Sequence, residues 1–403
     1  MPKTISDPAQ RQAPLEALRN RKMAASAHAY VRGSTVKFYE WLAASDRAVL
    51  PEGPPVWICG DCHVGNLGPV ASTDGSLAIQ IRDLDQTVIG NPAHDLVRLG
   101  LSLAMAARGS DLPGVTTAHM LEHMIDGYEA ALAVPADNDA AADRRDLPPI
   151  VRSVMRKAAG RSWRHLADER IEGEEPVIPL GKRFWPLSSA EREAVKLLFE
   201  QDAMRRLATA LRARADDAPV RVMDAAFWRK GCSSLGRLRI AVLVAIDKGR
   251  AERHALMDIK EATQAAAPHR ADAGMPSDHA VRVVTGARHL SPFLGSRMAA
   301  SHLLGKPVFL RELLPQDLKL EIDHLTRGAA IEVARYLAYV VGTAHARQLD
   351  AAGRAAWLRD LQGNRSRTLD APSWLWNAIV ALVAAHEAAY LEHCRRYALV
   401  EVG

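Results

Sequence analysis

The sequence has few aromatic residues, few cysteines and no long uninterrupted apolar run. Phe, Tyr and Trp make up 5% of its 403 residues, too few for the aromatic platform on which proteins stack single-stranded nucleic acid. Residues 1–21 contain no apolar core of a secretory signal. The most apolar late stretch, 374–391, is interrupted by His386 and Glu387 and is short for a membrane span. We therefore expect a cytoplasmic protein with no membrane span.

Charge of either sign is also not in large excess. Lys and Arg number 52 against 47 Asp and Glu, a formal net charge of +5. This balance suits anionic substrates such as nucleotides and does not indicate a nucleic-acid-binding surface. An apolar fraction of 48% is ordinary for a globular protein, and the length allows a sizeable core in two or three units.

Two neighbouring stretches carry the polar residues that are most informative about function. Residues 58–66, Ile-Cys-Gly-Asp-Cys-His-Val-Gly-Asn, follow a short apolar run, and a second apolar run at 77–81 leads into Arg-Asp-Leu-Asp. Such runs predict short buried strands, so a strand-loop-strand unit would present Asp61, Asn66 and Asp83 on neighbouring loops. Phosphoryl transfer needs one Asp at the acceptor hydroxyl, and an Asn and a second Asp on Mg²⁺.

Cys59 and Cys62 admit other interpretations of the same stretch. With His63 they spell C-x-x-C-H, the pattern of c-type haem attachment. That chemistry requires export, which nothing in the sequence signals, and a redox pair normally opens a helix after a strand. Neither alternative explains the Asn and Asp that follow, so a coincidental cysteine pair within a phosphotransfer loop is the favoured interpretation.

A change of period at residue 220 predicts a small sheet. Segments 220–229, 238–247 and 255–262 have the apolar character of strands, and the first two are joined by Lys-Gly-Cys-Ser-Ser-Leu-Gly. Small residues in such a loop let backbone N–H groups approach phosphate, although a tight hairpin is the commoner cause of this pattern. Lys260 is stronger evidence, because an isolated buried charge is costly unless it is paired.

These residues resemble a known family. Gly60 to Asn66 looks like the G-D-x-H-x-x-N catalytic loop of aminoglycoside-phosphotransferase-like kinases, and Asp83-Leu84-Asp85 is similar to their metal-binding motif. In the run Gly90 to Leu96, Asp95 corresponds to the Asp that braces the loop. The chain is also similar to an uncharacterised bacterial domain-of-unknown-function family of the protein-kinase-like superfamily, with Arg82 in place of an Asn.

The resemblance implies a fold with an unusual order of parts. Kinases begin with the nucleotide lobe, whereas here the catalytic loop comes first and the helix expected before it, 327–350, is near the C-terminus. The resemblance therefore implies an α+β, bilobal protein-kinase-like fold that is circularly permuted, with a helix-rich large lobe, a small antiparallel-sheet nucleotide lobe and one active cleft. The expected divisions are 1–217 (first part of the catalytic lobe), 218–312 (nucleotide lobe) and 313–403 (hinge and remaining helices).

The resemblance also assigns roles to individual residues. Asp61 and His63 would be catalytic, and Asn66, Asp83 and Asp85 would hold Mg²⁺. The expected ATP-binding residues, with Glu312 at the hinge, are Gly231, Ser233, Ser234, Gly236, Lys260 and Glu312. Arg32 would either clamp phosphate or anchor its helix by a salt bridge, and His345 would pack near the loop.

The resulting hypothesis is an ATP- and Mg²⁺-dependent phosphotransferase acting on a hydroxyl of an unknown small molecule or protein. Kinases pair the strand lysine with a Glu on a helix, and between Glu261 and Glu312 this sequence has none. This departure keeps two alternatives open, a nucleotide-binding pseudokinase and an enzyme of the same fold that transfers AMP. The structural alternative is that Asp61 and Asp83 only cap their loops.

Overall fold

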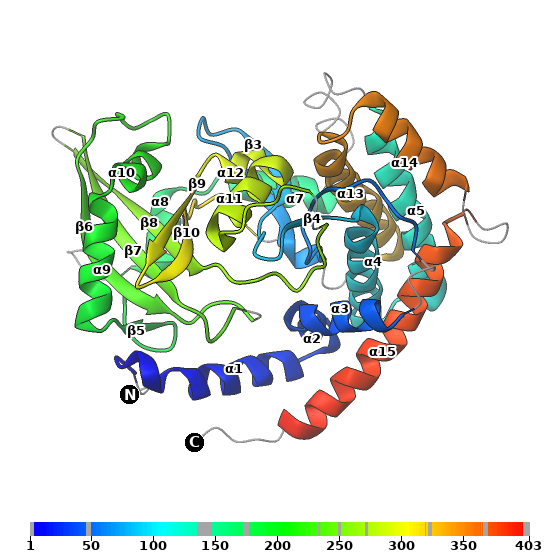
Figure 1. Cartoon of the computed structure of the whole chain (residues 1–403), viewed down its shortest axis with the longest axis horizontal. Coiled ribbons are helices and arrows are strands. Elements are labelled where there is room, and N and C mark those ends of the chain that lie inside the picture. Colours follow the sequence, from blue (N-terminus) through cyan, green and yellow to red (C-terminus); the bar gives the residue numbers. More distant parts are fainter. Residues whose placement is uncertain are drawn as a thin grey trace.

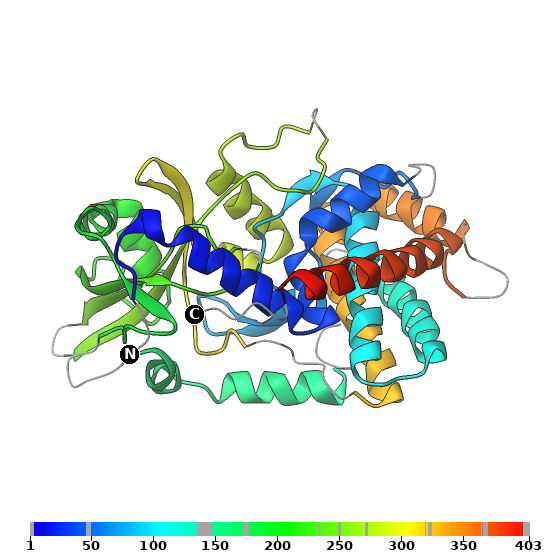
Figure 2. The same cartoon turned by 90° about the horizontal axis from the view of Figure 1, so that it is seen from below.

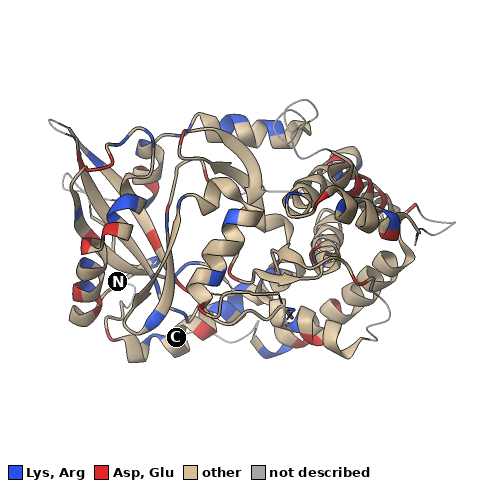
Figure 3. Ribbon diagram, turned by 45° about the horizontal axis from the view of Figure 1, so that its top comes forward, with Lys and Arg blue, Asp and Glu red and all other residues tan. Residues whose placement is uncertain are grey.

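The protein is a mixed α+β structure with antiparallel sheets. The computed structural model describes residues 4–45, 50–134, 147–171, 177–232, 234–248, 251–270, 273–318, 320, 325–363, 365 and 370–397. In Figure 1 a sheet region lies on the left and a helical region on the right, with short strands between them. Residues of both charges are interspersed over the two regions (Figure 3).

The sheet region is built on a six-stranded sheet whose described strands run in the order β5-β6-β7-β8-β10-β9, all antiparallel. The strands are β5 (Phe184–Pro186), β6 (Val220–Trp228), β7 (Arg239–Lys248), β8 (Ala251–Glu261), β9 (Met298–Leu303) and β10 (Lys306–Glu312). Dense β-branched residues predict β7 correctly, and the predicted segments 220–229 and 255–262 agree with β6 and β8 within a few residues at their ends. The sequence analysis did not identify β5 or β9.

Both faces of the sheet are covered. On one face, α9 (Ser189–Glu200) and α10 (Asp202–Thr209) pack against side chains such as Val242 and Met257. The two helices are separated at Gln201, whose backbone is extended. On the other face, Leu166 of α8 (Trp163–Arg170) packs against Leu243 and Leu256. Because β5, α9 and α10 belong to it, the sheet region begins before residue 218.

The helical region has its own core. Its helices are α4 (Pro92–Gly109), α5 (Gly114–Ala133), α7 (Pro149–Ala159), α13 (Arg327–Ala346), α14 (Ala351–Gly363) and α15 (Ser373–Tyr397). Asn91 caps α4 by accepting from the Ala93 N–H, and Pro92 stands at its first turn. A Cβ on Gly127 of α5 would lie 2.0 Å from the Arg335 carbonyl oxygen of α13, so glycine is what permits this close crossing.

Two small ladders lie between the regions. β1 (Val56–Ile58) pairs with β4 (Val88–Gly90), and β2 (Leu67–Ala71) forms a hairpin with β3 (Leu77–Ile81). The two apolar runs predicted as strands, 56–58 and 77–81, are β1 and β3. They belong to different ladders, because β2 lies beside β3 and β4 beside β1. Both loops that carry the polar residues still emerge from these ladders, at 59–66, which includes the 3₁₀ helix η3 (Val64–Asn66), and at 82–87.

The N-terminal helices link the two regions. After η1 (Pro8–Gln10), the expected helical stretch 14–45 is split into α1 (Gln12–Ala24), α2 (Ala27–Gly33) and α3 (Thr35–Ala44). Figures 1 and 2 show α1 lying along both regions. Arg11, just before α1, pairs with Glu191 at 2.7 Å, and the other end of α1 contacts α15 through His393 and the Asn20 carbonyl, 2.8 Å apart.

Two further elements complete the arrangement. Helices α11 (His279–Leu290) and α12 (Pro292–Gly295) connect β8 to β9, and α11 packs against β1 and β10 while α12 packs against β2. Among the described residues, α15 is the one helix long and apolar enough to cross a membrane by length and composition. One face of α15 is buried in the helical core through Trp374, Leu375, Ala378, Ile379, Leu382 and His386.

Candidate active site

The backbone of the 59–66 loop is held by a carboxylate. Asp95, in the first turn of α4, accepts from the Cys59 N–H at 2.7 Å and from the Gly60 N–H at 2.9 Å. Asp95 is itself 3.3 Å from His345 Nε2, and His345 Nδ1 is 2.9 Å from the Tyr128 hydroxyl. The predicted brace role of Asp95 is confirmed, and His345 acts on the loop through it.

Asp61 projects from this loop into contact with α4. Arg98, one turn after Asp95, donates to Asp61 Oδ1 from Nε at 3.0 Å and lies 2.9 Å from it through a terminal nitrogen. Burial raises the pKa of Asp61 above its usual value, and the charge and hydrogen bond of Arg98 oppose that rise. A buried carboxylate of raised pKa is a stronger base than a solvated one, which suits proton acceptance.

Two other predicted residues lie on the same loop. His63 Nε2 is 3.9 Å from Asp61 Oδ2, and burial together with Arg98 and Arg32 lowers the pKa of His63 well below its usual value, so the ring is neutral. The Asn66 amide nitrogen donates to the Asp61 carbonyl at 2.9 Å, which leaves the amide oxygen available as a metal ligand. Arg32 Nε and His63 Nδ1 are buried without a hydrogen-bond partner among the described residues.

Lys260 meets both carboxylates of the 82–87 loop. Its ammonium lies 3.2 Å from Asp83 Oδ1 and pairs more closely with Asp85 Oδ2. The Lys260 side chain is 4% exposed and the Asp83 side chain 43% exposed. Lys260 and Asp83 are separated by 177 positions in the sequence, so this convergence is a product of the tertiary fold.

The two carboxylates around Lys260 are electrostatically distinct. Burial and the adjacent Asp83 charge raise the pKa of Asp85. For Asp83, burial acts in the same direction, but the Lys260 charge and a hydrogen bond from Asp85 outweigh it and lower the pKa of Asp83. Asp83 is therefore the carboxylate that stays ionised when one proton is shared between the two.

Helix α11 attaches to the 82–87 loop through an arginine. Arg282 of α11 is buried and donates to the backbone carbonyls of Asp85, Thr87 and Thr263. These bonds attach the 82–87 loop to the chain that follows β8. Lys260 thus takes its carboxylate partners from the loop, while α11 holds the loop in place.

The predicted glycine-rich loop lies between β6 and β7. Gly231 and Gly236 have φ of +99° and +98°, which non-glycine residues rarely adopt. Ser234 is buried, and a Cβ on Gly231 would lie 2.4 Å from its hydroxyl oxygen. α1 packs against the loop, since Lys22 Nζ donates to the Gly231 carbonyl at 3.1 Å. The fourth residue predicted there, Ser233, lies outside the described residues.

Glu312 does not join the other predicted residues. It lies at the end of β10 on the same face as Val308 and Leu310, opposite to the face that carries Lys260. There it accepts from Arg214 at 2.6 and 2.7 Å. We therefore remove the Glu312 side chain from the candidate nucleotide contacts and assign it a structural ion pair.

The donor set of the 82–87 loop fits Mg²⁺. Among the described residues no group of three or more His, Cys, Asp or Glu side chains gathers at metal-ligand distance. Magnesium, however, usually takes one or two carboxylates together with phosphate and water oxygens. Asp85 Oδ1 is buried without a hydrogen-bond partner, and Asp83 is half-exposed beside it. Orphaned hard oxygens of this kind suit the ion, with Asn66 as a third ligand.

Comparison with known proteins assigns the family. The model of a family described as an uncharacterized protein conserved in bacteria (DUF2252) matches residues 11–396. The chain belongs to this family. No curated protein and no solved structure matches the chain. The expected membership of an uncharacterised bacterial family is confirmed, and in this DUF2252 protein the function has to be argued from the site itself.

The cysteine pair of this DUF2252 chain lies inside the core rather than at a reactive surface. Cys59 and Cys62 are free thiols that are almost completely buried. The hydrogen bond with Cys62, together with burial, raises the pKa of the Cys59 thiol well above its usual value. A buried thiol of high pKa is a poor nucleophile, and the segment forms a loop rather than the start of a helix.

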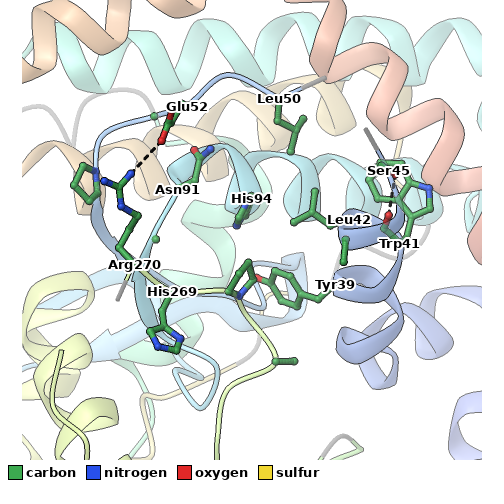
Figure 4. A pocket seen from close by; sticks show the side chains of 16 residues that line it. Tyr39, Trp41, Leu42, Ser45, Leu50, Glu52, Asn91, His94, His269 and Arg270 are labelled. Carbon is green, nitrogen blue, oxygen red and sulfur yellow. Dashed lines mark hydrogen bonds and ion pairs between the residues drawn. The ribbon is translucent and has the colours of Figure 1, made fainter. Parts of the chain in front are cut away.

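A cavity of about 630 Å³ lies beside the 59–66 loop (Figure 4). Tyr39 and Trp41 line one side, His94 lies in the middle, and Arg270 pairs with Glu52 at 3.1 Å across the rim. The Tyr39 hydroxyl donates to the Gly60 carbonyl at 2.6 Å. Tyr39 therefore links the wall of the cavity to the backbone that precedes Asp61. The cavity was not predicted from the sequence.

Sequence reasoning also missed charged residues on the sheet. Arg239 donates to Asp258 at 2.8 and 2.5 Å, and Arg311 lies 3.5 Å from the same carboxylate. Arg239 and Asp258 interrupt otherwise apolar strands, as Lys260 does. The rule that flagged Lys260, a charge within a buried strand, would have found them too.

Proposed function

We propose that this protein is an ATP- and Mg²⁺-dependent phosphotransferase with a bilobal, circularly permuted protein-kinase-like fold. The observation that carries the proposal is the contact of Lys260 with Asp83 and Asp85. A lysine on the central strands of a sheet and a D-x-D loop from a separate region are the parts that hold nucleotide phosphates and their metal in such enzymes.

In this proposal Asp61 accepts the proton of an acceptor hydroxyl while the hydroxyl oxygen attacks the γ-phosphorus of ATP. The bond between that phosphorus and the β,γ-bridging oxygen breaks, and ADP leaves. Arg98 holds Asp61 in position, and Asp95 holds the loop backbone. Lys260 supplies positive charge to the phosphates, and Asn66, Asp83 and Asp85 would hold Mg²⁺, which neutralises charge on the phosphate oxygens.

The order of the elements supports the permuted fold. The 59–66 and 82–87 loops precede the sheet in the chain, and α13, which brings His345 to the brace, follows it. The end of α1 contacts α15, because the Tyr390 hydroxyl donates to the Ala24 carbonyl at 3.3 Å. The first and last described helices are therefore neighbours, as a permutation requires.

Two other functions use the same parts. A pseudokinase would bind nucleotide without turnover, and an AMP-transferring enzyme would release pyrophosphate. The absence of a Glu partner on the helix motivated the first, but Lys260 finds its partners in Asp83 and Asp85, which favours a working site. In this proposal the phosphate acceptor is a hydroxyl group of an unknown small molecule or protein. We expect the enzyme to be cytoplasmic.

The first test is a thermal-unfolding shift with ATP, with and without Mg²⁺. Ligand at 100 times its Kd adds about 2.7 kcal/mol to stability, which raises Tm measurably. We expect a Mg²⁺-dependent shift in the wild type and in Asp168→Ala, an exposed carboxylate of α8, and none in Asp83→Ala. A folded wild type that shows no shift with nucleotide would contradict the proposal.

Turnover separates the three functions. With a hydroxyl-bearing acceptor, or water as the default acceptor, the wild type should release ADP, while Asp61→Ala keeps nucleotide binding and loses turnover. Pyrophosphate as the product would indicate AMP transfer. Nucleotide binding without any Asp61-dependent turnover would indicate a pseudokinase.

A further inference from the structure

Three cations surround one indole ring in the sheet region. Trp228, the last residue of β6, is buried, with Lys230 Nζ 4.2 Å from its ring centroid. The guanidinium carbons of Arg239 and Arg170 are 5.0 and 5.7 Å from the same centroid. Each cation is attracted to the ring at these distances, but together they place positive charge in one small volume.

The carboxylates nearby do not balance this charge. Asp258 serves both Arg239 and Arg311, and the Glu169 carboxylate, 3.8 Å from Arg170, is 44% exposed and shared with Arg161. The Lys230 ammonium makes no hydrogen bond or ion pair with any described residue. We call this group the Trp228 cluster, and it consists of Arg170, Trp228, Lys230, Arg239, Asp258 and Arg311.

Such an arrangement is costly without a ligand. Burial and the neighbouring Arg239 lower the pKa of Lys230 well below its usual value. Arg170 Nε and Arg311 Nε are also buried donors with no hydrogen-bond partner among the described residues. Buried cations are normally paired, and unpaired ones destabilise the folded state. Within the described part of the chain Lys230 has no ion pair, Arg170 Nε has no acceptor, and Arg311 Nε has only the shared Asp258 carboxylate at 3.5 Å. This excess of positive charge in one place indicates that an anion completes the cluster.

The cluster adjoins the proposed phosphate site. Burial opposes the charge on Arg239, but the Asp258 charge and hydrogen bond outweigh it and raise the pKa of Arg239. The Asp83 and Asp85 charges add to this rise without forming an ion pair with Arg239. Arg239 stands directly opposite Lys260 in the β7–β8 ladder, so both side chains are on the same face. Arg311 donates to the carbonyl of Arg82 at 2.8 Å, next to Asp83. Lys230 immediately precedes Gly231 of the glycine-rich loop.

We infer that the Trp228 cluster is a second anion site, with Lys230 as its principal ligand, that binds a phosphate group other than the one held at Asp83 and Asp85. The inference rests on the proposed function for the identity of the neighbouring site, but Lys230, its principal ligand, is not one of the residues assigned to that site. Two ligands could supply a phosphate group of this chemistry. One is the nucleotide, through its distal phosphates, and the other is a phosphorylated second substrate.

The test is calorimetric titration of inorganic pyrophosphate into the full chain without Mg²⁺. We expect Lys230→Met to weaken binding at least tenfold, Lys230→Arg to keep it within a few-fold, and Lys196→Met, an exposed lysine of α9, to leave it unchanged. Because an unpaired buried charge is removed, Lys230→Met should also raise Tm or leave it unchanged, whereas a purely structural lysine would lower it.

Two outcomes would overturn the inference. One is pyrophosphate binding that is equal in the wild type and in Lys230→Met, and the other is no pyrophosphate binding by the folded wild type. Binding that is lost in Lys260→Met and kept in Lys230→Met would reject the second site and leave the proposed function standing. Conversely, a protein with no Mg²⁺-ATP shift that still binds pyrophosphate through Lys230 would keep the site and reject the proposed function.

A competition arm identifies the source of the phosphate. Pyrophosphate that is displaced by saturating ATP supports the site and assigns it to the nucleotide's own phosphates. Pyrophosphate that binds alongside ATP, and remains dependent on Lys230, supports the site and assigns it to a phosphorylated second substrate.

Discussion

The 59–66 loop and the Trp228 cluster both bury charged groups, but they differ in how these groups are partnered. In the loop, Asp95 receives two backbone N–H groups and His345, and His345 is satisfied in turn by Tyr128. In the cluster, three cations surround one indole and a fourth, Arg311, lies beside them, while the single carboxylate buried among them, that of Asp258, pairs with only two of the four.

Whether a buried charged group has partners within the protein distinguishes structural groups from groups that bind a ligand. A polar network whose members are all satisfied rigidifies the fold, whereas buried donors without acceptors cost stability unless something else completes them. By this criterion Asp95 and His345 are structural. Asp85 and Arg32, each with a buried unpartnered polar atom, and Lys230, whose ammonium has no ion pair with a described residue, are the residues directed at a ligand.

The largest effect is expected when the closed network is broken. Asp95→Ala would leave the buried Cys59 and Gly60 N–H groups unsatisfied, and we expect a loss of about 3–5 kcal/mol in the free energy of unfolding. Asp83→Ala should cost no more than about 1 kcal/mol, because that side chain is half-exposed and Lys260 keeps Asp85.

Urea unfolding of the two variants measures this contrast. If Asp95→Ala does not fold, Asp95→Asn serves instead, because it keeps one acceptor and should lose part of the same free energy. Equal destabilisation by the Asp95 and Asp83 variants would contradict the assignment of one residue to structure and the other to a ligand.

The ion pairs of Asp258 with Arg239 and Arg311 should contribute less to the free energy of unfolding. Burial opposes ionisation of Asp258, but the Arg239 and Arg311 charges outweigh it and lower its pKa from 3.8 to about 2. A depressed folded-state pKa stabilises the protein above the unfolded value, here by about 2–3 kcal/mol. This contribution is lost as the pH falls from about 4 towards 2, and it is present in full at pH 7.

Urea midpoints of the wild type and Asp258→Asn, compared from pH 7 down to pH 3, test this linkage. The wild type should be the more stable at pH 7, and the gap should narrow below pH 4. A gap that stays constant over the whole range would mean that Asp258 does not act through its charge.

A single hydrogen bond to the loop should have a smaller effect. Tyr39→Phe removes the donor to the Gly60 carbonyl and should cost about 1–2 kcal/mol. Hydrogen exchange of the Gly60 amide should accelerate, because the same peptide segment is held by Asp95. Tyr390→Phe is the matched control, since its hydroxyl bonds to Ala24 on α1 and not to the loop; it should leave the Gly60 amide protected.

The smallest effect is expected for an ion pair with no role in either network. Lys37 and Glu40 on α3 are paired, but their side chains are 59% and 55% exposed. Glu40→Ala should change the free energy of unfolding by less than about 0.5 kcal/mol. A larger change in urea unfolding would show that an exposed ion pair stabilises this protein as much as a buried one, and would contradict the importance assigned to burial.

Some features of this protein follow from short stretches of sequence. The strands β6, β7 and β8 and the helices α4, α5 and α13 carry their signal in residues a few positions apart, through β-branched density or helical spacing. The 59–66 loop was identified for the same reason, because Asp61, His63 and Asn66 lie within six residues of one another. Asp95, some thirty residues further along, could be added only through resemblance.

The tertiary structure alone decided which distant residues meet. β1 pairs with β4, Lys260 meets Asp83 across 177 positions and Asp85 two residues beyond it, and Glu312 lies on the opposite face from Lys260 and pairs with Arg214. No local period encodes these contacts, because they depend on packing between elements that are far apart in the chain. The Trp228 cluster is the same case: each charge is visible in the sequence, but only the antiparallel register of β7, β8 and β10 shows that Arg239 and Arg311 share the Asp258 carboxylate.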